Sequence, residues 1–284
     1  MNPLGRIGIF VAGLVLVFGA AVGVGSLVEP ADTEDGGHGG GGHGAAAHTA
    51  AGYSLDLDST SFARGEPAEL SFSVLADGEP VAGFDELHER RMHLIVVRRD
   101  GRGFQHLHPE MDEEGTWLVP IEFGEAGEYR AFADFSVGGE QRTLSRDLSV
   151  SGGAFRPRPF PAPRPLASAG GGYEVRLDAG DPVAGESSSL GFSVGRNGEP
   201  VGDLDPYLGA RGHLVALREG DLAFLHVHPE AAEGHGHGGQ PEGAAHGEIA
   251  FGATFPSAGR YRLYLQFRHE GVVRTAAFTV EVPR

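Results

Sequence analysis

Short runs of alternating apolar and polar residues follow one another along most of the chain, and no long stretch has the period of a helix. In residues 53–58 and 68–74 the apolar side chains fall at every second position, which is the period of a strand with one buried face. Residues 129–137 and 142–150 add further strand-like runs, and glycine, proline, asparagine and aspartate separate the runs. The pattern predicts an all-β fold of packed sheets, a β-sandwich.

The pattern occurs twice. Residues 78–81 (Gly-Glu-Pro-Val) recur 120 residues later at 198–201, and residues 126–130 recur at 258–262 with an offset of 132, because the second copy carries an insert. Two copies indicate a tandem domain duplication rather than a solenoid. The Ala-Gly-x-Tyr sequence in the later element of each copy resembles the tyrosine corner of immunoglobulin-like sandwiches. The sequence therefore predicts two tandem immunoglobulin-like β-sandwich domains.

The first residues predict a membrane anchor. Residues 7–28 form an apolar run without a charge, preceded by Arg6 and followed by acidic residues. About 20 such residues span a bilayer, and the positive-inside rule places both domains on the extracytoplasmic side. The alternative is a signal peptide that is cleaved to give a secreted protein. We expect one N-terminal transmembrane helix and a single-pass protein of the cell membrane.

Two low-complexity segments complete the predicted organisation. One is a glycine- and histidine-rich linker, and the other is rich in proline and arginine, a composition that favours a stiff extended conformation. The predicted parts are an anchor or signal segment 1–28, a flexible linker 29–51, a first sandwich 52–150, a linker 151–171 and a second sandwich 172–284 with a histidine-rich insert 233–247.

Composition restricts the partners. The formal charge is −17 over 284 residues and there is no lysine, which argues against nucleic acid and anionic lipid headgroups as partners. There is also no cysteine, so disulfides and thiolate metal ligands are excluded. Any metal site must therefore be built from other side chains.

Three histidines keep one spacing in both copies. The two sets are His93, His106 and His108, and, 120 residues later, His213, His226 and His228. An accidental spacing need not survive in both copies, so these six residues are the candidate functional residues.

The spacing predicts that each trio converges. Residues 92–97 and 104–108 have the composition of strands, and a turn centred on Asp100-Gly101 would join them as a β-hairpin. Residues whose numbers sum to 201 then face each other across the hairpin. Facing residues have Cβ atoms about 5 Å apart, and residues two apart in a strand share a face.

The rule sets His93 opposite His108, with His106 on the same face. The same rule around the turn of the second copy sets His213 opposite His228. Three ring nitrogens in each hairpin can therefore converge on one ion.

The donor set suggests the metal. Imidazoles without thiolates suit Zn²⁺ or Cu²⁺. Met92 and Met111 flank the first trio and would add soft thioether donors, so copper is favoured, with zinc as the alternative; the second copy has Gly212 and Ala231 at these positions. We expect a copper ion as the bound cofactor.

Other polar residues are candidates for supporting roles. Glu110 and Glu230 follow each His-x-His-Pro and would be a fourth ligand, a partner that orients an imidazole, or simply turn carboxylates. In the insert, His235, His237 and His246 could load the metal transiently, or belong to a solvated spacer. 

Not every histidine is expected to bind a metal. His88 and His269 have no histidine counterpart in the other copy, which predicts ordinary surface residues. The trios themselves have an alternative, purely structural interpretation. Because Ile95, Val97 and Phe104 share the histidine face, the imidazoles can equally be buried, hydrogen-bonded groups without a metal.

Residues 212–217 (Gly-His-Leu-Val-Ala-Leu) and 224–229 (Phe-Leu-His-Val-His-Pro), with the Ala-Gly-x-Tyr-Arg element, invite a family comparison. They resemble bacterial extracytoplasmic proteins called YtkA-like or heavy-metal-associated. The resemblance covers both repeats and implies immunoglobulin-like domains with a part in metal handling. The first copy departs from it, with Arg91-Met92 in place of the Arg-Gly of the second.

The sequence thus predicts a membrane-anchored extracytoplasmic protein that binds metal ions for buffering, resistance or transfer, with an envelope protein as a possible partner. The alternative is a metal-free adhesion or scaffolding module of the cell envelope. A zinc hydrolase is a third class, but no general base or substrate pocket is evident, so we do not expect an enzyme.

Overall fold

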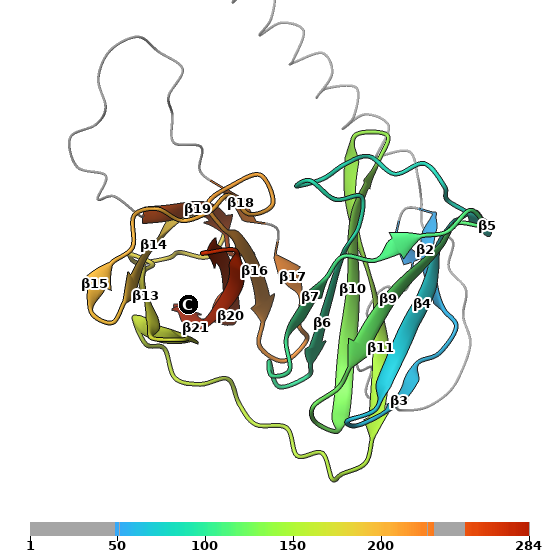
Figure 1. Cartoon of the computed structure of the whole chain (residues 1–284), viewed down its shortest axis with the longest axis horizontal. Coiled ribbons are helices and arrows are strands. Elements are labelled where there is room, and N and C mark those ends of the chain that lie inside the picture. The colour runs from blue at the N-terminus through green and yellow to red at the C-terminus, as the bar shows by residue number, and fades with distance from the viewer. Residues whose placement is uncertain (1–48, 51, 226, 230–247, 284) are drawn as a thin grey trace, which may run out of the picture. The chain divides into compact units, whose positions relative to one another are not determined.

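A computed structural model describes residues 49–50, 52–225, 227–229 and 248–283 (Figure 1). Every regular element in these ranges is a β-strand. No helix in the described part of the chain is long and apolar enough to cross a membrane, and the predicted anchor 7–28 lies outside that part. The all-β prediction is therefore confirmed for the described residues.

The first copy forms two sheets. One has the strand order β1-β2-β4-β9-β8, with β5 also paired to β4, and the other has the order β3-β11-β10-β6-β7. The strands are β1 (Thr49–Ala50), β2 (Tyr53–Leu57), β3 (Ser61–Ala63), β4 (Pro67–Ala76), β5 (Glu79–Pro80), β6 (His93–Arg98), β7 (Gln105–Leu107), β8 (Glu110–Met111), β9 (Thr116–Glu122), β10 (Gly127–Val137) and β11 (Glu140–Ser151).

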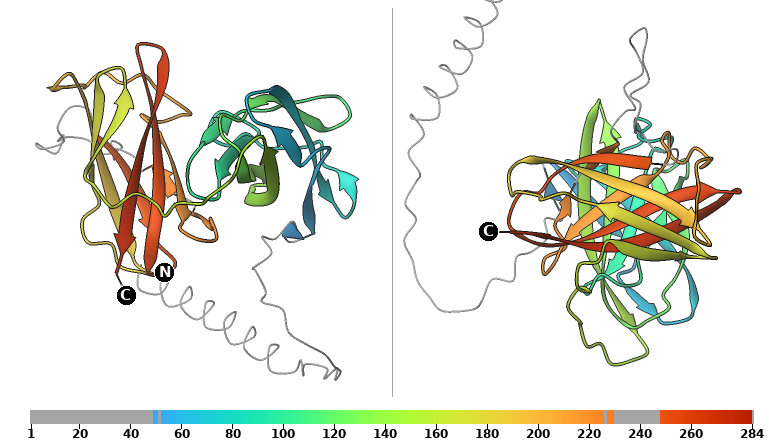
Figure 2. Two further views of the ribbon diagram at one scale, coloured as in Figure 1. Left: turned by 90° about the horizontal axis from the view of Figure 1, so that it is seen from below. Right: turned by 90° about the vertical axis from the view of Figure 1, so that its left-hand side faces the viewer.

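The second copy repeats this plan. Its sheets have the orders β12-β13-β14-β19-β18, with β15 on β14, and β17-β16-β20-β21. The long β20–β21 hairpin can be followed in red in Figure 2. The strands are β12 (Leu166–Gly170), β13 (Tyr173–Asp178), β14 (Ser187–Arg196), β15 (Glu199–Pro200), β16 (His213–Arg218), β17 (Phe224–Leu225), β18 (Val227–Pro229), β19 (Glu248–Thr254), β20 (Gly259–His269) and β21 (Val272–Val282).

The strand order is that of an immunoglobulin-type sandwich. Strands β2, β4, β9 and β8 take the places of A, B, E and D, and β11, β10 and β6 those of G, F and C. The short strand β3 pairs in parallel with β11, whereas all other pairings of the first copy are antiparallel. Each sandwich encloses its own apolar core between its two sheets.

The tyrosine corner is present in both copies. The Tyr129 hydroxyl donates a hydrogen bond to the Glu125 carbonyl oxygen at 2.8 Å, and Tyr261 donates to the Ser257 carbonyl oxygen at the same distance. Both rings are buried. The corner predicted from Ala-Gly-x-Tyr is confirmed, and it fixes the start of β10 and β20 against the preceding loop.

Strand β6 is buried on both faces. Leu94 and Val96 point into the core of the first sandwich, while Ile95 and Val97 belong to a separate apolar cluster. This cluster also contains residues of the second sandwich and is called the inter-sandwich cluster below. Its buried members are Ile95, Val97, Phe132, Phe160, Val215, Leu217, Leu222 and Tyr264. The outer faces of β6 and β16 therefore cover each other, which explains the nearly continuous apolar sequences of both strands.

Two strands lie in ranges predicted as linkers. Strand β12 pairs with β13, so the second sandwich begins at Leu166 rather than at residue 172, and β1 falls within 29–51. The sequence does not predict β12, because this strand follows prolines and buries only small side chains, Ala167 and Ala169. In the proline-rich linker, Phe160 is buried in the inter-sandwich cluster, which ties the linker to both copies.

We expect Tyr129→Phe to lower the free energy of unfolding by about 1 to 2 kcal/mol, because it removes a hydroxyl that satisfies a carbonyl at a buried ring. Denaturant unfolding followed by tryptophan fluorescence measures this, since Trp117 lies in the same core. The control is Tyr53→Phe, whose ring is only half-buried. Equal stability of the two variants would contradict a stabilising tyrosine corner.

Candidate functional site

The register of the first hairpin is the predicted one. Strand β6 pairs with β7 as Leu94 with Leu107 and Ile95 with His106, so the numbers of facing residues sum to 201. In the second hairpin Ala216 faces Leu225, which is the register predicted for that copy. Extending the first register by one residue sets His93 opposite His108, as predicted.

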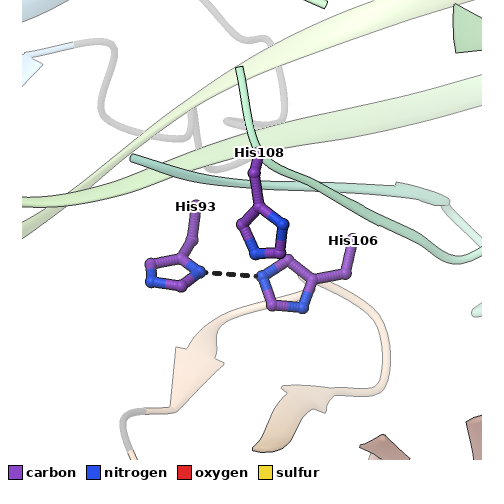
Figure 3. A group of neighbouring side chains, drawn as sticks. All are labelled: His93, His106 and His108. Atoms are coloured by element: carbon purple, nitrogen blue, oxygen red, sulfur yellow. Dashed lines mark hydrogen bonds between the residues drawn. The ribbon is translucent and has the colours of Figure 1, made fainter. Parts of the chain in front are cut away.

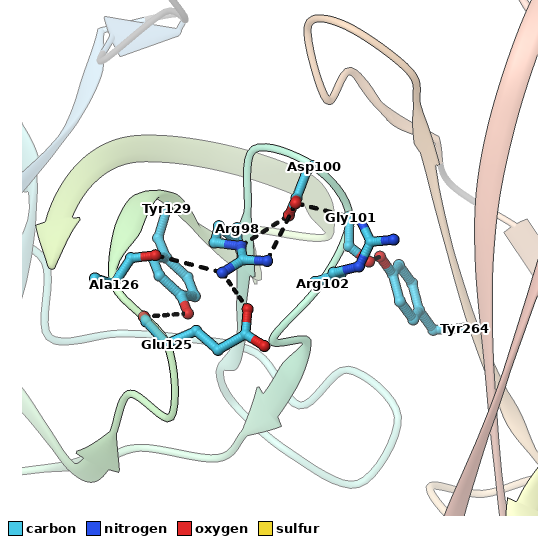
Figure 4. A network of polar contacts seen from close by, with 8 residues as sticks. All are labelled: Arg98, Asp100, Gly101, Arg102, Glu125, Ala126, Tyr129 and Tyr264. Atoms are coloured by element: carbon cyan, nitrogen blue, oxygen red, sulfur yellow. Dashed lines mark hydrogen bonds and ion pairs between the residues drawn. The ribbon is translucent and has the colours of Figure 1, made fainter. Parts of the chain in front are cut away.

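A buried ionic network holds the turn of this hairpin (Figure 4). Arg98 donates two hydrogen bonds to the Asp100 carboxylate, at 2.8 and 3.1 Å, and pairs with Glu125 of the tyrosine corner. Burial alone would raise the pKa of Asp100, but its contacts with Arg98 and Arg102 hold that pKa below its ordinary value. The turn that sets the histidine register is therefore fixed by charge as well as by backbone pairing.

The three histidines of the first copy meet in space (Figure 3). One nitrogen from each of His93, His106 and His108 lies within 4.8 Å of the others. The ring centroids are 5.2 Å apart for His93–His106 and His93–His108, and 4.8 Å apart for His106–His108. His93 is buried, and the other two are half-buried.

Outward hydrogen bonds decide which nitrogens carry protons. His93 Nε2 lies 2.8 Å from the Leu87 carbonyl oxygen, and His106 Nδ1 lies 2.5 Å from Gln266 Oε1. The Gln266 amide nitrogen donates to Thr275, which leaves Oε1 as the acceptor for His106. With this orientation of the Gln266 amide both outer nitrogens are N–H donors, and the neutral rings carry lone pairs on the inner nitrogens.

The inner nitrogens face each other. His93 Nδ1 and His106 Nε2 are 3.0 Å apart, so in the neutral rings assigned above two lone pairs point at one another without a proton between them. A third inner nitrogen, His108 Nε2, is buried and has no hydrogen-bond partner among the described residues. Such a group lacks the partner that buried polar atoms normally have. A cation between the rings would satisfy all three nitrogens.

The spacing suits a metal ion. Imidazole nitrogens bound to one ion at about 2.0 Å lie roughly 2.8 to 3.3 Å apart, and the ring centroids roughly 4.5 to 5.2 Å apart. The three centroid distances of the trio fall in the range for centroids, and the 3.0 Å between His93 Nδ1 and His106 Nε2 falls in the range for nitrogens. The nitrogen of His108 lies within 4.8 Å of the other two and must move closer to bind the same ion. The outward bonds from His93 and His106 are of the kind that orients metal-ligating histidines.

Burial keeps the imidazoles neutral. Desolvation is the largest cause in each case, and it lowers the pKa of His108 to about 4 and that of His213 to about 3. The pKa of His106 is well below its ordinary value for the same reason, with neighbouring imidazoles adding to the shift. For His93, burial also lowers the pKa, although the hydrogen bond to Leu87 opposes the shift. A proton is thus a poor candidate for the cation.

The second predicted trio is described only in part. His226 lies outside the described residues, and His228 lies in β18, whose backbone pairs with β19 in the other sheet. His213, the counterpart of His93, lies next to the first trio, with its ring centroid 4.8 Å from that of His106. Glu230, His235, His237 and His246 also lie outside the described residues.

Glu110 and the two methionines are not part of the histidine group. Glu110 is exposed on β8. Met92 is buried in the core of the first sandwich and Met111 packs against that core, so the thioether argument for copper is wrong. Neighbouring residues of a strand point to opposite faces, which turns Met92 away from the side chain of His93.

Two residues beside the trio were not predicted from the sequence. The prediction of an exposed His88 is wrong, because this residue is half-buried, with its ring centroid 6.0 Å from that of His93. Its positive φ of 49° belongs to the tight loop that presents the Leu87 carbonyl. For Gln266, the sequence contains no indication of a role at the site except its position 132 residues after Asp134, which makes the two residues counterparts in the two copies. His269 was also predicted to be exposed, but it is 8% exposed and hydrogen-bonded to Tyr173.

Several solved structures are distantly similar. The Escherichia coli adhesin FdeC has 13% identity and a TM-score of 0.27, with 82% of this chain and 64% of that chain covered. Escherichia coli alpha-2-macroglobulin activated by porcine elastase has 13% identity and a TM-score of 0.28, with coverages of 82% and 20%. The Yersinia pseudotuberculosis adhesin InvE has 10% identity and a TM-score of 0.23, with coverages of 81% and 59%. The chain spans less than two thirds of each, and TM-scores below 0.5 carry no argument about function.

No curated protein matches the sequence. A domain of unknown function, DUF8832, matches residues 47–152 and 167–284, one range for each copy. The resemblance to YtkA-like proteins stays a prediction. Because the two matches together cover well over half of the chain, this protein belongs to the DUF8832 family.

Proposed function

We propose that this protein binds a transition-metal ion at His93, His106 and His108, in order to buffer the ion or pass it on. The observation that carries the proposal is the contact of two inner nitrogens that have no proton between them, His93 Nδ1 and His106 Nε2, beside the buried and unpartnered His108 Nε2. A metal ion relieves the lone-pair contact of His93 with His106 and gives His108 Nε2 a partner. Neutral rings are also the form that binds metal ions.

Copper is the favoured ion, with zinc as the alternative. The donor set is imidazole only, which suits both. Nitrogen sites bind Cu²⁺ more tightly than the other divalent first-row ions, Zn²⁺ included. The preference for copper therefore rests on this order of affinities and not on thioether ligands. Membrane anchoring and an extracytoplasmic location belong to the proposal as its setting, and they rest on the uncharged apolar run 7–28 and the charges that flank it.

Calorimetric titration of the protein with Cu²⁺ and with Zn²⁺ tests the proposal. We expect tight binding that is lost when the trio is changed, with Cu²⁺ bound more tightly. The histidine-rich segments outside the described residues contribute weak metal binding. This weak binding is distinguished from that of the trio because it persists when the trio is changed. Absence of tight binding would leave the metal-free module, in which the histidines only brace the hairpin.

We expect His108→Leu to lower metal affinity at least about 100-fold, because loss of a ligand costs more than loss of an orienting partner, which costs about 10- to 100-fold. Without metal, the same variant should keep its free energy of unfolding or gain about 1 kcal/mol, because an unsatisfied buried nitrogen disappears. Calorimetry and denaturant unfolding measure the two effects.

The matched control for this variant is His269→Leu. Both of its ring nitrogens have partners, Tyr173 and Asp203. We therefore expect the opposite result, a loss of stability with unchanged metal affinity. If His108→Leu behaved like the control, His108 would be a structural residue.

Gln266→Leu should lower metal affinity about 10- to 100-fold, because His106 then loses the acceptor that directs its other nitrogen at the ion. Calorimetry measures the affinity, and Gln105→Leu is the control, since its amide bonds to Glu122 instead. Equal affinities of the two variants would count against the assigned tautomer of His106.

The pH dependence of binding is also expected to be unusual. Ligands with a pKa near 6.5 would lose about 10³-fold in affinity between pH 7.5 and 5.5, because protons compete with the metal for three rings. Here the folded protein holds these pKa values below 6.5, at about 4 for His108, so competition begins only at lower pH. Titrations with Zn²⁺ should show less than about tenfold loss over this range. A loss near 10³-fold would contradict buried, neutral ligands.

A further inference from the structure

The second sandwich closes the open side of the histidine trio. Gln266, from β20, hydrogen-bonds His106 across 160 residues of sequence. The neighbouring contact is apolar and close, since the Phe104 ring stacks on Tyr264 with centroids 4.0 Å apart and planes 7° apart. Tyr264 also donates a hydrogen bond to the Gly101 carbonyl oxygen in the hairpin turn (Figure 4). The trio thus lies at the contact between the two copies.

His213 enters the same place from the second sandwich. It begins β16 as His93 begins β6, and the two rings lie nearly parallel, with centroids 5.5 Å apart and planes 10° apart. Its register partner is Gln266, just as Asp134 is the partner of His93. The two copies therefore bring matched histidines together when the outer faces of β6 and β16 cover each other.

The position of His213 suits a fourth ligand. Its centroid lies 4.8 Å from that of His106, within the roughly 4.5 to 5.2 Å expected for two imidazoles on one ion, and 5.5 Å from that of His93, slightly beyond this range. Its nitrogens are not among those of the trio that lie within 4.8 Å of one another, so its ring must turn to reach the ion. No hydrogen bond from a described residue holds the His213 ring in its present orientation. 

We infer that His213 completes the site, so that one metal ion is held by four imidazoles from both sandwiches. The inference rests on the proposed metal binding at the trio and adds to it a coupling between the ion and the contact of the two copies. Four ligands close the coordination sphere in the manner of a structural zinc site. An ion that binds only the docked arrangement stabilises that arrangement in proportion to its concentration and affinity.

The sharpest test is His213→Cys in the full chain, which has no other cysteine. Thiolates bound to Co²⁺ give an intense charge-transfer absorption in the near ultraviolet, which imidazole complexes lack. We expect this band with His213→Cys and not with the wild type when Co²⁺ is added. The matched control is His88→Cys, because the His88 ring is also near the trio, 5.7 Å from that of His213, but is not a proposed ligand. It should bind Co²⁺ without the band.

The outcomes separate the two proposals. If the wild type does not bind Co²⁺, Cu²⁺ or Zn²⁺ tightly, metal binding itself fails. If it binds but His213→Cys gives no band, or gives the same band as His88→Cys, the trio alone holds the ion and the four-histidine site is wrong. A second variant, His213→Gln, covers the case in which the cysteine variant does not fold; at least a tenfold loss of affinity supports the inference, and unchanged affinity overturns it.

Discussion

The contact between the inner nitrogens of His93 and His106 is the constraint on which the site depends. Each ring is fixed from outside, by the Leu87 carbonyl and by the Gln266 side chain, so neither can turn its N–H inward. Backbone pairing of β6 with β7 then holds the rings close. Burial disfavours protonation, which would otherwise resolve the conflict. Under the proposed function, a bound metal ion resolves this conflict between the two rings.

The tandem duplication gives the arrangement its surroundings. A single copy would expose the outer face of β6, with Ile95 and Val97, to water, whereas the second copy covers this face with the equivalent residues of β16. The same contact supplies Gln266 to His106. Apolar burial and polar orientation of the site therefore come from one docking event. Neither sandwich alone presents the complete set of groups.

Much of the fold and half of the site could be predicted from the sequence. The strand period and the Asp100-Gly101 turn are local signals, so the register that groups the first trio could be derived from them. What covers the outer face of β6 is not a local property, and the roles of Gln266 and His88 depend on it. Strand β12 was lost because its buried side chains are alanines. The prediction that Met92 adds a thioether ligand also conflicts with a local signal. Met92 is the immediate neighbour of His93, and neighbouring side chains in an extended chain point to opposite faces.

The linker between the copies has a consequence of its own. Phe160 is anchored in the inter-sandwich cluster, and its backbone bonds to Glu219 and Arg260 of the second copy. A tether pinned in this way keeps the two halves at high effective concentration, so separation of the faces would be brief and local. The linker therefore contributes to the affinity of the two copies for each other as well as connecting them.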